Sequence, residues 1–214
     1  MQKNTSQQPE ARRGVPPRRA RSPQLHEVRI IGGHWKRTKL KVVDRPGLRP
    51  TPDRVRETVF NWLGQDMTGK RCVDAFAGTG ALGFEAASRG ATEVLLVEQD
   101  ALLAAQLETV RAQLLALQRP EPVQQSLRVQ RGEGVASLRQ LGTASQDVVF
   151  LDPPFDAGLY PAALAAAARA LAPGGVVYLE APTAWTDELL APYGLVQHRH
   201  LKAGAVHAHV LRAA

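Results

Sequence analysis

The segment DPPF at residues 152–155 is the part of the sequence with the clearest chemical use. It follows the apolar run VVFL, so we expect it where a buried strand ends. Two successive prolines remove two backbone N–H donors, which leaves the Asp152 carboxylate and the carbonyls of Pro153 and Pro154 as acceptors. Such a strip favours a ligand with an amino group, and Phe155 adds a flat surface on which a nucleobase can stack.

The chemistry that suits this strip is alkylation of a nucleobase amino group. An exocyclic amine is a poor nucleophile because its lone pair is delocalised into the ring. Hydrogen bonds from its two protons to Asp152 and to the Pro153 carbonyl favour pyramidalisation and aim the lone pair at an electrophilic carbon. We therefore assign a catalytic role to Asp152, Pro153, Pro154 and Phe155. The alternative, a turn that ends a buried strand, explains the prolines but not the flanking acid and aromatic ring.

A glycine-rich loop, DAFAGTGALG at residues 74–83, predicts a nucleoside-binding turn. Gly78, Gly80 and Gly83 fit the pattern G-x-G-x-x-G, and Glu98 follows at the distance expected of a ribose-binding acid. This pattern alone leaves a nicotinamide dehydrogenase open. Asp74 argues for a different cofactor, because a carboxylate repels a pyrophosphate but can hold the ammonium group of the cationic S-adenosylmethionine. Glu98 suits either cofactor.

The elements that must position these residues form a regular α/β pattern after residue 70. Five units, each a short apolar strand followed by a helix, predict a parallel sheet covered on both faces. The units are CVDAF with ALGFEAASR, EVLLVE with ALLAAQLETVRAQLLAL, SLRVQ with GVASLRQL, DVVFLD with residues 161–172, and VVYLE with TDELLA. Two further strands around Ala203 and Gly204 predict an antiparallel pair at one edge. Ligands of such sheets bind at the carboxyl ends of the strands, here residues 74–80, 98, 130–133, 152–155 and 180.

Basic side chains are concentrated before this α/β part. Residues 1–70 contain 16 of the 27 lysines and arginines but only 6 of the 20 acidic residues. This asymmetry predicts a basic part that faces a polyanion. Residues 1–24 have almost no apolar side chains and are expected to be a disordered basic tail, which either keeps the protein soluble or contacts phosphates without sequence preference.

Residues 25–70 interleave basic and apolar side chains and are expected to form a basic hairpin and a helix that face RNA. The hairpin is predicted from VRIIGG and KRTKLKVV, with Lys36 and Arg37 on its second arm. Thr51 is the expected N-cap of the helix, with Pro52 in the first turn. Val55, Val59, Trp62 and Leu63 share one face, which predicts that Arg54 and Arg56 point toward solvent.

Other features limit the class of protein. With one cysteine, Cys72, neither an internal disulfide nor a cysteine-based zinc cluster is possible, and we expect a protein of the reducing cytosol. We expect neither a membrane span nor a secretory signal. Residues 198, 200, 207 and 209 are histidines at alternate positions, but without a neighbouring carboxylate cluster we expect no metal site there.

These motifs together resemble those of the RsmD family of bacterial small-subunit ribosomal RNA guanine-N2 methyltransferases. The resemblance covers about residues 27–212 and rests on RIIGG, GLRPTPDRVRETVFNWL, DAFAGTGALG, EQD and DPPF. The glycine and DPPF motifs are shared by many amino-methylating enzymes, whereas RIIGG followed by LRPT-x-DRVRE narrows the match. The resemblance implies a Rossmann-like class I methyltransferase over residues 71–214, with a mostly parallel seven-stranded sheet, helices on both faces and the N-terminal hairpin and helix as an extension.

The family's function implies the roles of individual residues. The resemblance implies that the target is N2 of one guanine, position 966 in the usual 16S numbering, in the small ribosomal subunit or its assembly intermediate. We expect a cytoplasmic monomer. After the third strand the family has Asp or Asn followed by Ala, whereas this chain has Glu133 and Gly134. The residues implied to bind S-adenosylmethionine are Asp74, Phe76, Gly78, Gly80, Glu98 and Glu133, and those implied to contact RNA are Arg29, Lys36, Arg37, Arg49, Thr51 and Arg54.

Three other functions remain open from the sequence. One is the dehydrogenase. A second is a DNA methyltransferase acting on adenine N6 or cytosine N4, because an acid, two prolines and an aromatic residue also suit those amines. The third is a non-enzymatic RNA-binding factor in ribosome assembly.

Overall fold

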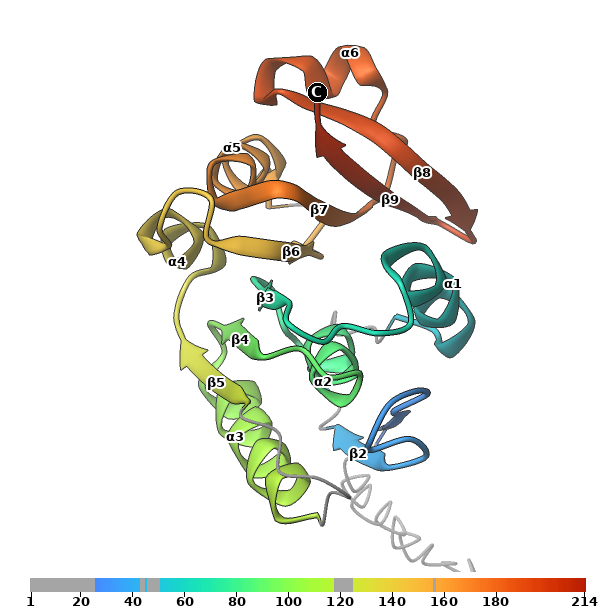
Figure 1. The fold of residues 1–214 in the computed structure, drawn as a ribbon, viewed down its shortest axis with the longest axis vertical. Coiled ribbons are helices and arrows are strands. Elements are labelled where there is room, and N and C mark those ends of the chain that lie inside the picture. The colour runs from blue at the N-terminus through green and yellow to red at the C-terminus, as the bar shows by residue number, and fades with distance from the viewer. Residues whose placement is uncertain (1–25, 43–44, 46–50, 118–124, 156) are drawn as a thin grey trace, which may run out of the picture.

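The fold was analysed in a computed structural model, which describes residues 26–42, 45, 51–117, 125–155 and 157–214. A seven-stranded sheet forms its centre (Figure 1). The strands lie in the order β5 (Ser126–Arg131), β4 (Glu93–Glu98), β3 (Arg71–Asp74), β6 (Gln146–Leu151), β7 (Leu171–Ala181), β9 (Val206–Ala213) and β8 (Leu195–Ala203). The first five are parallel, whereas β9 is antiparallel to both β7 and β8. The fold is therefore the predicted mostly parallel, Rossmann-like class I sheet with an antiparallel pair at one edge.

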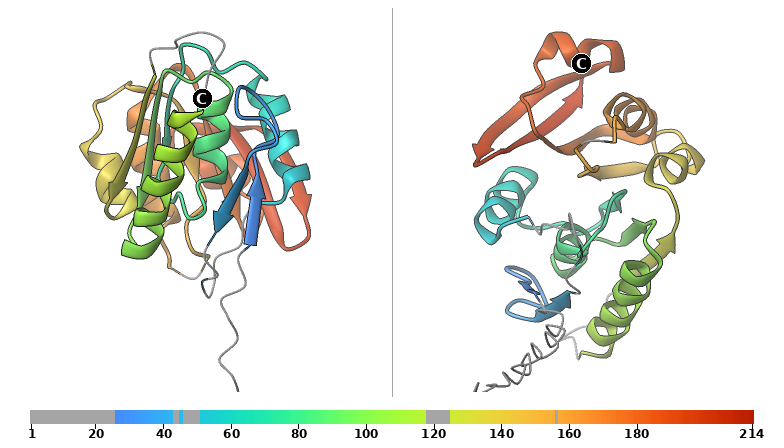
Figure 2. Two further views of the ribbon diagram at one scale, coloured as in Figure 1. Left: turned by 90° about the horizontal axis from the view of Figure 1, so that it is seen from below. Right: turned by 180° about the vertical axis from the view of Figure 1, so that it is seen from behind.

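Helices cover both faces of the sheet, as the buried apolar strands require (Figures 1 and 2). One face packs against α1 (Asp53–Leu63), α2 (Ala81–Ser88) and α3 (Ala101–Ala116). The other face packs against α4 (Gly134–Gln140), α5 (Tyr160–Ala170) and the short α6 (Asp187–Leu190), which a 3-10 turn, Ala191–Tyr193, follows. Within the described residues, no helix is both long and apolar enough to cross a membrane.

The N-terminal hairpin consists of β1 (His26–Arg29) and β2 (Lys39–Val42), which pair antiparallel. The predicted hairpin is confirmed, but its arms are shorter than expected. Lys36 and Arg37 were predicted on the second arm and lie instead in the connection, where both are exposed. Trp35, which directly precedes them, is buried, and its indole ring holds this connection against the core.

The connection between β1 and β2 docks on the last turn of α2. The backbone N–H of His34 donates to the Ser88 carbonyl at 2.7 Å, and that of Trp35 donates to Ser88 Oγ at 2.9 Å. Gly33 adopts a φ of +72°, and a Cβ atom built on it would lie 1.9 Å from the Ser88 carbonyl oxygen. Only glycine allows both the left-handed turn and this approach.

Gly33→Ala is accordingly expected to destabilise the protein by roughly 3 kcal/mol, since left-handed strain and steric overlap add. Gly204→Ala is the matched control, because Gly204 also has a positive φ, +62°, but has no atom within 4 Å of its Cβ position. Urea unfolding of both variants measures the difference. Equal losses of unfolding free energy in the two variants would contradict the close packing at Gly33.

Helix α1 differs from its prediction at both Thr51 and Arg56. The N-cap is Pro52, without a side-chain cap, and the Thr51 hydroxyl reaches across the molecule to Glu180. Arg56 was predicted to point toward solvent, but its side chain is fully buried. Arg54 is exposed, as expected.

The Arg56 guanidinium connects three elements through hydrogen bonds. It donates to the Arg29 carbonyl of β1 at 2.8 Å, to Asp53 Oδ1 at 2.5 Å and to Glu85 Oε2 of α2 at 3.4 Å. Glu85 is also fully buried and accepts a second charged partner, Arg89, at 2.8 Å. This buried ionic network fixes the hairpin and α1 to the α2 side of the sheet.

Candidate functional site

Three carboxylates share one face of the sheet at its carboxyl edge. Asp74, Asp152 and Glu180 stand at or just after the ends of β3, β6 and β7, which are neighbouring strands. Because side chains alternate along a strand, Asp152 faces the same side as Phe150, and Glu180 the same side as Tyr178. The Phe150 and Tyr178 rings are in edge contact, with centroids 6.2 Å apart. The two predicted acids therefore lie close together, with Glu180 beside them.

Asp74 is held by the glycine loop that follows β3. Its Oδ2 accepts the backbone N–H of Gly83 in the first turn of α2 at 3.0 Å. Gly80 is the N-cap of that helix with a φ of +77°, the left-handed conformation that glycine favours. Burial, with the nearby charges of Glu98 and Glu180, raises the pKa of Asp74 to about 7. A buried carboxyl group of this kind gains most from a cationic ligand.

Glu98 closes the other side of the loop. Its Oε2 accepts the N–H of Gly78 at 2.9 Å, and its Oε1 accepts the N–H of Asp100 at 2.8 Å. Each carboxylate oxygen keeps a lone pair, so the side chain can still accept from the hydroxyl groups of a ribose. The structure thus brings together Asp74, Gly78, Gly80 and Glu98, four of the residues predicted to bind the cofactor.

The DPPF segment leaves β6 at the same edge. Pro153 is buried, Pro154 is exposed, and the Phe155 ring is 42% exposed, as a stacking surface must be. Burial, followed by the charges of Glu180 and Asp74, raises the pKa of Asp152 well above that of an ordinary aspartate. The segment therefore combines a basic acceptor with an open aromatic face.

Glu180 is a site residue to which the sequence assigned no role beyond its place at a strand end. The Thr51 hydroxyl donates to its Oε1 at 2.7 Å, and the Tyr178 hydroxyl donates to the same oxygen at 2.8 Å. Burial raises the pKa of Glu180, whereas these two hydrogen bonds act in the opposite direction. Thr51 was predicted to contact RNA, and the structure instead places its hydroxyl on this buried carboxylate.

Tyr160 is a second site residue that the sequence did not indicate. It starts α5, and its hydroxyl is buried without a hydrogen-bond partner in the described structure. Burial and the charges of Asp152 and Glu180 raise the pKa of this phenol, which keeps it protonated. A buried hydroxyl next to two carboxylates is a donor that a ligand can use.

Glu133, which the resemblance implies to bind S-adenosylmethionine, lies directly before α4. It caps α4, where its carboxylate accepts the N–H groups of Val135 and Ala136 at 2.9 and 2.7 Å. The family's alanine could not follow it, since a Cβ on Gly134 would lie 2.3 Å from the Ala75 carbonyl oxygen and 2.8 Å from the Phe76 ring. Gly134 therefore lets the predicted cofactor residue Phe76 pack against the start of α4.

The basic residues predicted to face RNA lie on the hairpin and on α1. Arg29 forms an exposed ion pair with Asp53 at 3.1 Å. Lys36, Arg37 and Arg54 are exposed and form no ion pair in the described structure. Arg49 and the basic tail lie outside the described residues.

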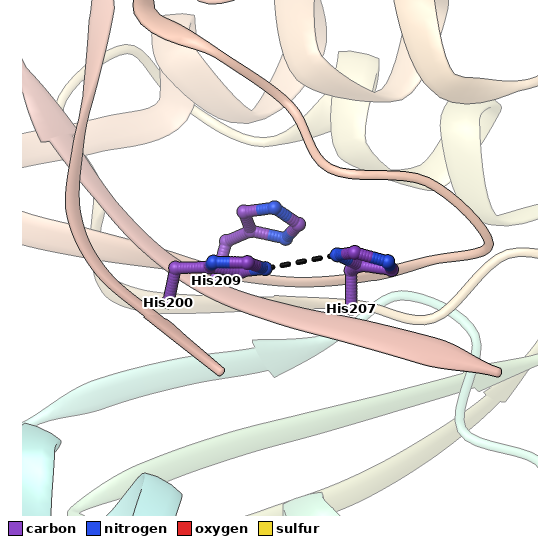
Figure 3. Close-up of side chains that lie close together, drawn as sticks. All are labelled: His200, His207 and His209. Atoms are coloured by element: carbon purple, nitrogen blue, oxygen red, sulfur yellow. Dashed lines mark hydrogen bonds between the residues drawn. The ribbon is translucent and has the colours of Figure 1, made fainter. Parts of the chain in front are cut away.

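Three histidines of the β8–β9 hairpin form a cluster, which Figure 3 shows. His200 Nε2 and His207 Nδ1 share a hydrogen bond of 2.9 Å, and the His209 ring stacks on His200 with centroids 4.7 Å apart. His209 Nε2 accepts the backbone N–H of Trp185 at 3.1 Å, so the neutral ring carries its proton on Nδ1 and has no lone pair left for a metal. We assign His209 a structural role: it holds Trp185, whose ring centroid lies 5.7 Å from that of Tyr160.

The arrangement fits S-adenosylmethionine better than a dinucleotide. Buried carboxylates on one face disfavour a pyrophosphate and favour a ligand that carries both an ammonium and a sulfonium group. Asp74 offers a carboxylate that suits an ammonium group, Glu98 offers acceptors that suit ribose hydroxyls, and DPPF offers acceptors that suit an amine.

Comparison with known proteins points in the same direction. Residues 28–212 match the model of a family described as conserved hypothetical protein 95. Ribosomal RNA small subunit methyltransferase D of Escherichia coli K12 is 47% identical over 133 residues, which cover 62% of this chain and 63% of that protein. The Haemophilus influenzae protein of the same name is 38% identical over 185 residues, which cover 81% of this chain and 92% of that protein. The chain thus matches slightly less than two thirds of the length of the E. coli relative.

Solved structures share the fold. That of the E. coli protein yhhF, described as a candidate methyltransferase, superposes with a TM-score of 0.73 at 38% identity and covers 88% of this chain and 98% of its own. A Haemophilus influenzae structure described as a candidate methylase has a TM-score of 0.68 at 32% identity. The match covers 88% of this chain and 99% of that one. The match to the family model, residues 28–212, includes most of the N-terminal hairpin and the whole sheet except Ala213.

Proposed function

Since the chain belongs to the conserved hypothetical protein 95 family, which is the RsmD family that its motifs resemble, we propose that it is an S-adenosylmethionine-dependent methyltransferase of small-subunit ribosomal RNA. We further propose N2 of guanine 966 in 16S RNA as the atom that it methylates. The observation that supports this most is the place of Asp152 at the sheet edge, one strand from the Asp74 loop. An acceptor for an amine and a site for a cationic donor are thereby adjacent.

The residues of the chain act mainly by positioning. S-adenosylmethionine, when bound, supplies a methyl group made electrophilic by a sulfonium. Asp152 and the Pro153 carbonyl accept the two N2 protons of the guanine, and Phe155 stacks on the base. As N2 forms its new bond, Asp152 takes up the departing proton and passes it to water, for which its raised pKa suits it. The guanine must leave its stack to enter this site.

The exposed basic residues of the hairpin and α1 are proposed to contact RNA phosphates. Lys36, Arg37 and Arg54 are exposed on elements that the ionic network of Arg56 fixes to the sheet, and Arg29 lies beside them. We place the protein in the cytoplasm, where small subunits are assembled, and propose that it acts as a monomer. Residues 1–24 and Arg49 are proposed to add contacts without sequence preference.

Labelled methyl transfer tests the function directly. Small subunits from cells that lack this protein, duplex DNA and protein-free RNA are each incubated with the protein and labelled donor. Reverse transcription and nucleoside chromatography then locate the label. We expect N2-methylguanosine at one position of the small-subunit RNA. Label in duplex DNA would favour a DNA methyltransferase that acts on adenine or cytosine. Tight binding to the subunit without label would favour an assembly factor. Thermal stabilisation by NAD but not by S-adenosylhomocysteine would favour a dehydrogenase.

Donor binding is expected to weaken as the pH falls below about 7, because Asp74 has a pKa of about 7. Below that pH the carboxyl group is mostly neutral, whereas the ammonium of the donor favours the charged form, so binding releases a proton. The affinity for S-adenosylhomocysteine should then fall by up to roughly tenfold per pH unit.

Calorimetry at several pH values, in buffers that differ in ionisation enthalpy, measures both the affinity and the released proton. Asp74→Asn should bind more weakly at pH 8 and lose most of the pH dependence. A wild-type affinity that is constant between pH 6 and 8 would rule out the proposed contact of Asp74 with the ammonium.

A further inference from the structure

Within the described residues, the two carboxylate oxygens of Glu180 differ in the hydrogen bonds that they accept. Both the Thr51 and the Tyr178 hydroxyl donate to Oε1, at 2.7 and 2.8 Å. In the described part of the chain no group donates to Oε2. Glu180 is only 5% exposed as a residue, so this acceptor lies in a nearly closed environment. A carboxylate oxygen in such surroundings favours a donor from a ligand.

Glu180 lies beside Asp152, the residue proposed to accept the amine. Strands β6 and β7 are paired up to Leu151 and Leu179, so the next residues, Asp152 and Glu180, are neighbours across the strands. Adjacent strands lie about 4.8 Å apart. Both side chains are on the face where Phe150 contacts Tyr178. The titration of Asp152 agrees with this position, because the charge of Glu180 raises the pKa of Asp152.

We propose that Glu180 selects guanine, by accepting the N1–H of the base on Oε2 while Asp152 accepts the adjacent N2–H. This inference rests on the proposed function and names the residue that recognises its substrate. Two acceptors side by side match two donors side by side. Guanine presents that pair on its Watson–Crick edge, in N1–H and the N2 amino group.

The other two bases with exocyclic amines do not match. Adenine places the lone pair of N1 next to its amine, and cytosine places that of N3 there. Either lone pair would face the Glu180 carboxylate, so repulsion would add to the loss of a hydrogen bond. Sites that bind a substrate N–H reject analogues without it far more strongly than apolar pockets reject a missing methylene. One carboxylate is therefore sufficient to separate guanine from both.

Thr51 and Tyr178 determine which atom of the residue 180 side chain faces the base. Their hydroxyls donate to Oε1 and so favour an acceptor at that position. In Glu180→Gln, the amide oxygen must take the place of Oε1, and the amide NH2 must then occupy the place of Oε2. The variant should present a donor to the base where the wild type presents an acceptor. Its preference should consequently change from N1–H to an N1 lone pair.

2-Aminopurine separates the two cases, because it has an amine on C2 but a lone pair on N1. Small subunits are reconstituted with RNA that carries either guanine or 2-aminopurine at the methylated position, and initial rates are compared. Wild-type protein should methylate the 2-aminopurine RNA on the order of 10²-fold more slowly than the guanine RNA. Glu180→Gln should lose a similar factor on guanine and prefer 2-aminopurine.

Binding provides an independent readout. With S-adenosylhomocysteine present, the fluorescence of 2-aminopurine rises when the base leaves its stack, and this rise should occur with Glu180→Gln but not with wild type. Glu188→Gln is the matched control: Glu188 also accepts a threonine hydroxyl, from Thr186 at 2.6 Å, but is exposed on α6 and should behave as wild type.

A reversed preference supports the proposal, because a merely destabilised variant would lose both substrates alike. Equal wild-type rates on the two RNAs, or a Glu180→Gln that loses both without reversal while still binding S-adenosylhomocysteine, would overturn it. Wild-type protein that does not methylate guanine RNA would instead overturn the proposed function, and this inference with it.

Discussion

Asp152→Ala is expected to reduce methyl transfer by about 10²–10⁴-fold while leaving donor affinity nearly unchanged. The substitution removes the acceptor that orients the amine and takes up its proton. Asp74, Gly78 and Glu98, the groups proposed to bind the donor, keep their own contacts in this variant. Single-turnover methyl incorporation measures the first effect, and calorimetry with S-adenosylhomocysteine measures the second.

Asp152→Asn is the informative companion, since its amide oxygen can still accept but cannot take up a proton. If positioning dominates, the asparagine variant should retain much more activity than the alanine variant. Equal loss in both would show that proton uptake by Asp152 governs the rate. Full activity of Asp152→Ala would refute the role of the DPPF segment altogether.

Arg56→Met is expected to destabilise the protein by about 3–5 kcal/mol, the usual consequence of removing one partner from a buried ionic group. Methionine fills much of the volume but leaves Glu85 with Arg89 as its remaining charged partner. It also leaves the Arg29 carbonyl without the bond that ties β1 to α1. Urea unfolding monitored by tryptophan fluorescence gives the free energy, and Trp35 and Trp62 both lie in the affected region.

Arg54→Met is the matched control, because Arg54 is exposed two residues away on the same helix. Its unfolding free energy should change by less than about 0.5 kcal/mol. A similarly small change in Arg56→Met would show that the network of Arg56 contributes little to stability.

The positions of the strands and of the site were largely predictable from local sequence. After residue 70, short apolar strands alternate with helices, which is the pattern expected of a parallel sheet covered on both faces. The described sheet is built from these strands. The glycine loop and DPPF could be placed at the carboxyl edge because both directly follow apolar runs. Their shared location then follows from the geometry of parallel strands.

The remainder depends on contacts between distant residues, for which the sequence has no local signal. Helical periodicity assigns Arg56 to solvent because it assumes that only one face of the helix is covered. In the structure, the hairpin also covers the face that carries Arg56. Thr51 has the spacing of an N-cap, yet its hydroxyl binds Glu180, 129 residues further along the chain. Glu133 and Gly134 depart from the family's pattern, and the close approach of Ala75 and Phe76 explains why residue 134 is a glycine.

The hydrogen bond from Thr51 to Glu180 has a consequence for protein engineering. Through this hydroxyl, Thr51, which lies before α1, contacts Glu180 near the end of β7. If residues 25–63 are exchanged for those of another family member, the graft must bring a hydroxyl side chain to position 51. If Glu180 has the proposed role, a chimera with valine at position 51 would retain its fold and its basic surface but discriminate less well among bases. Exchange of the N-terminal extension therefore requires that the hydroxyl group at position 51 be kept.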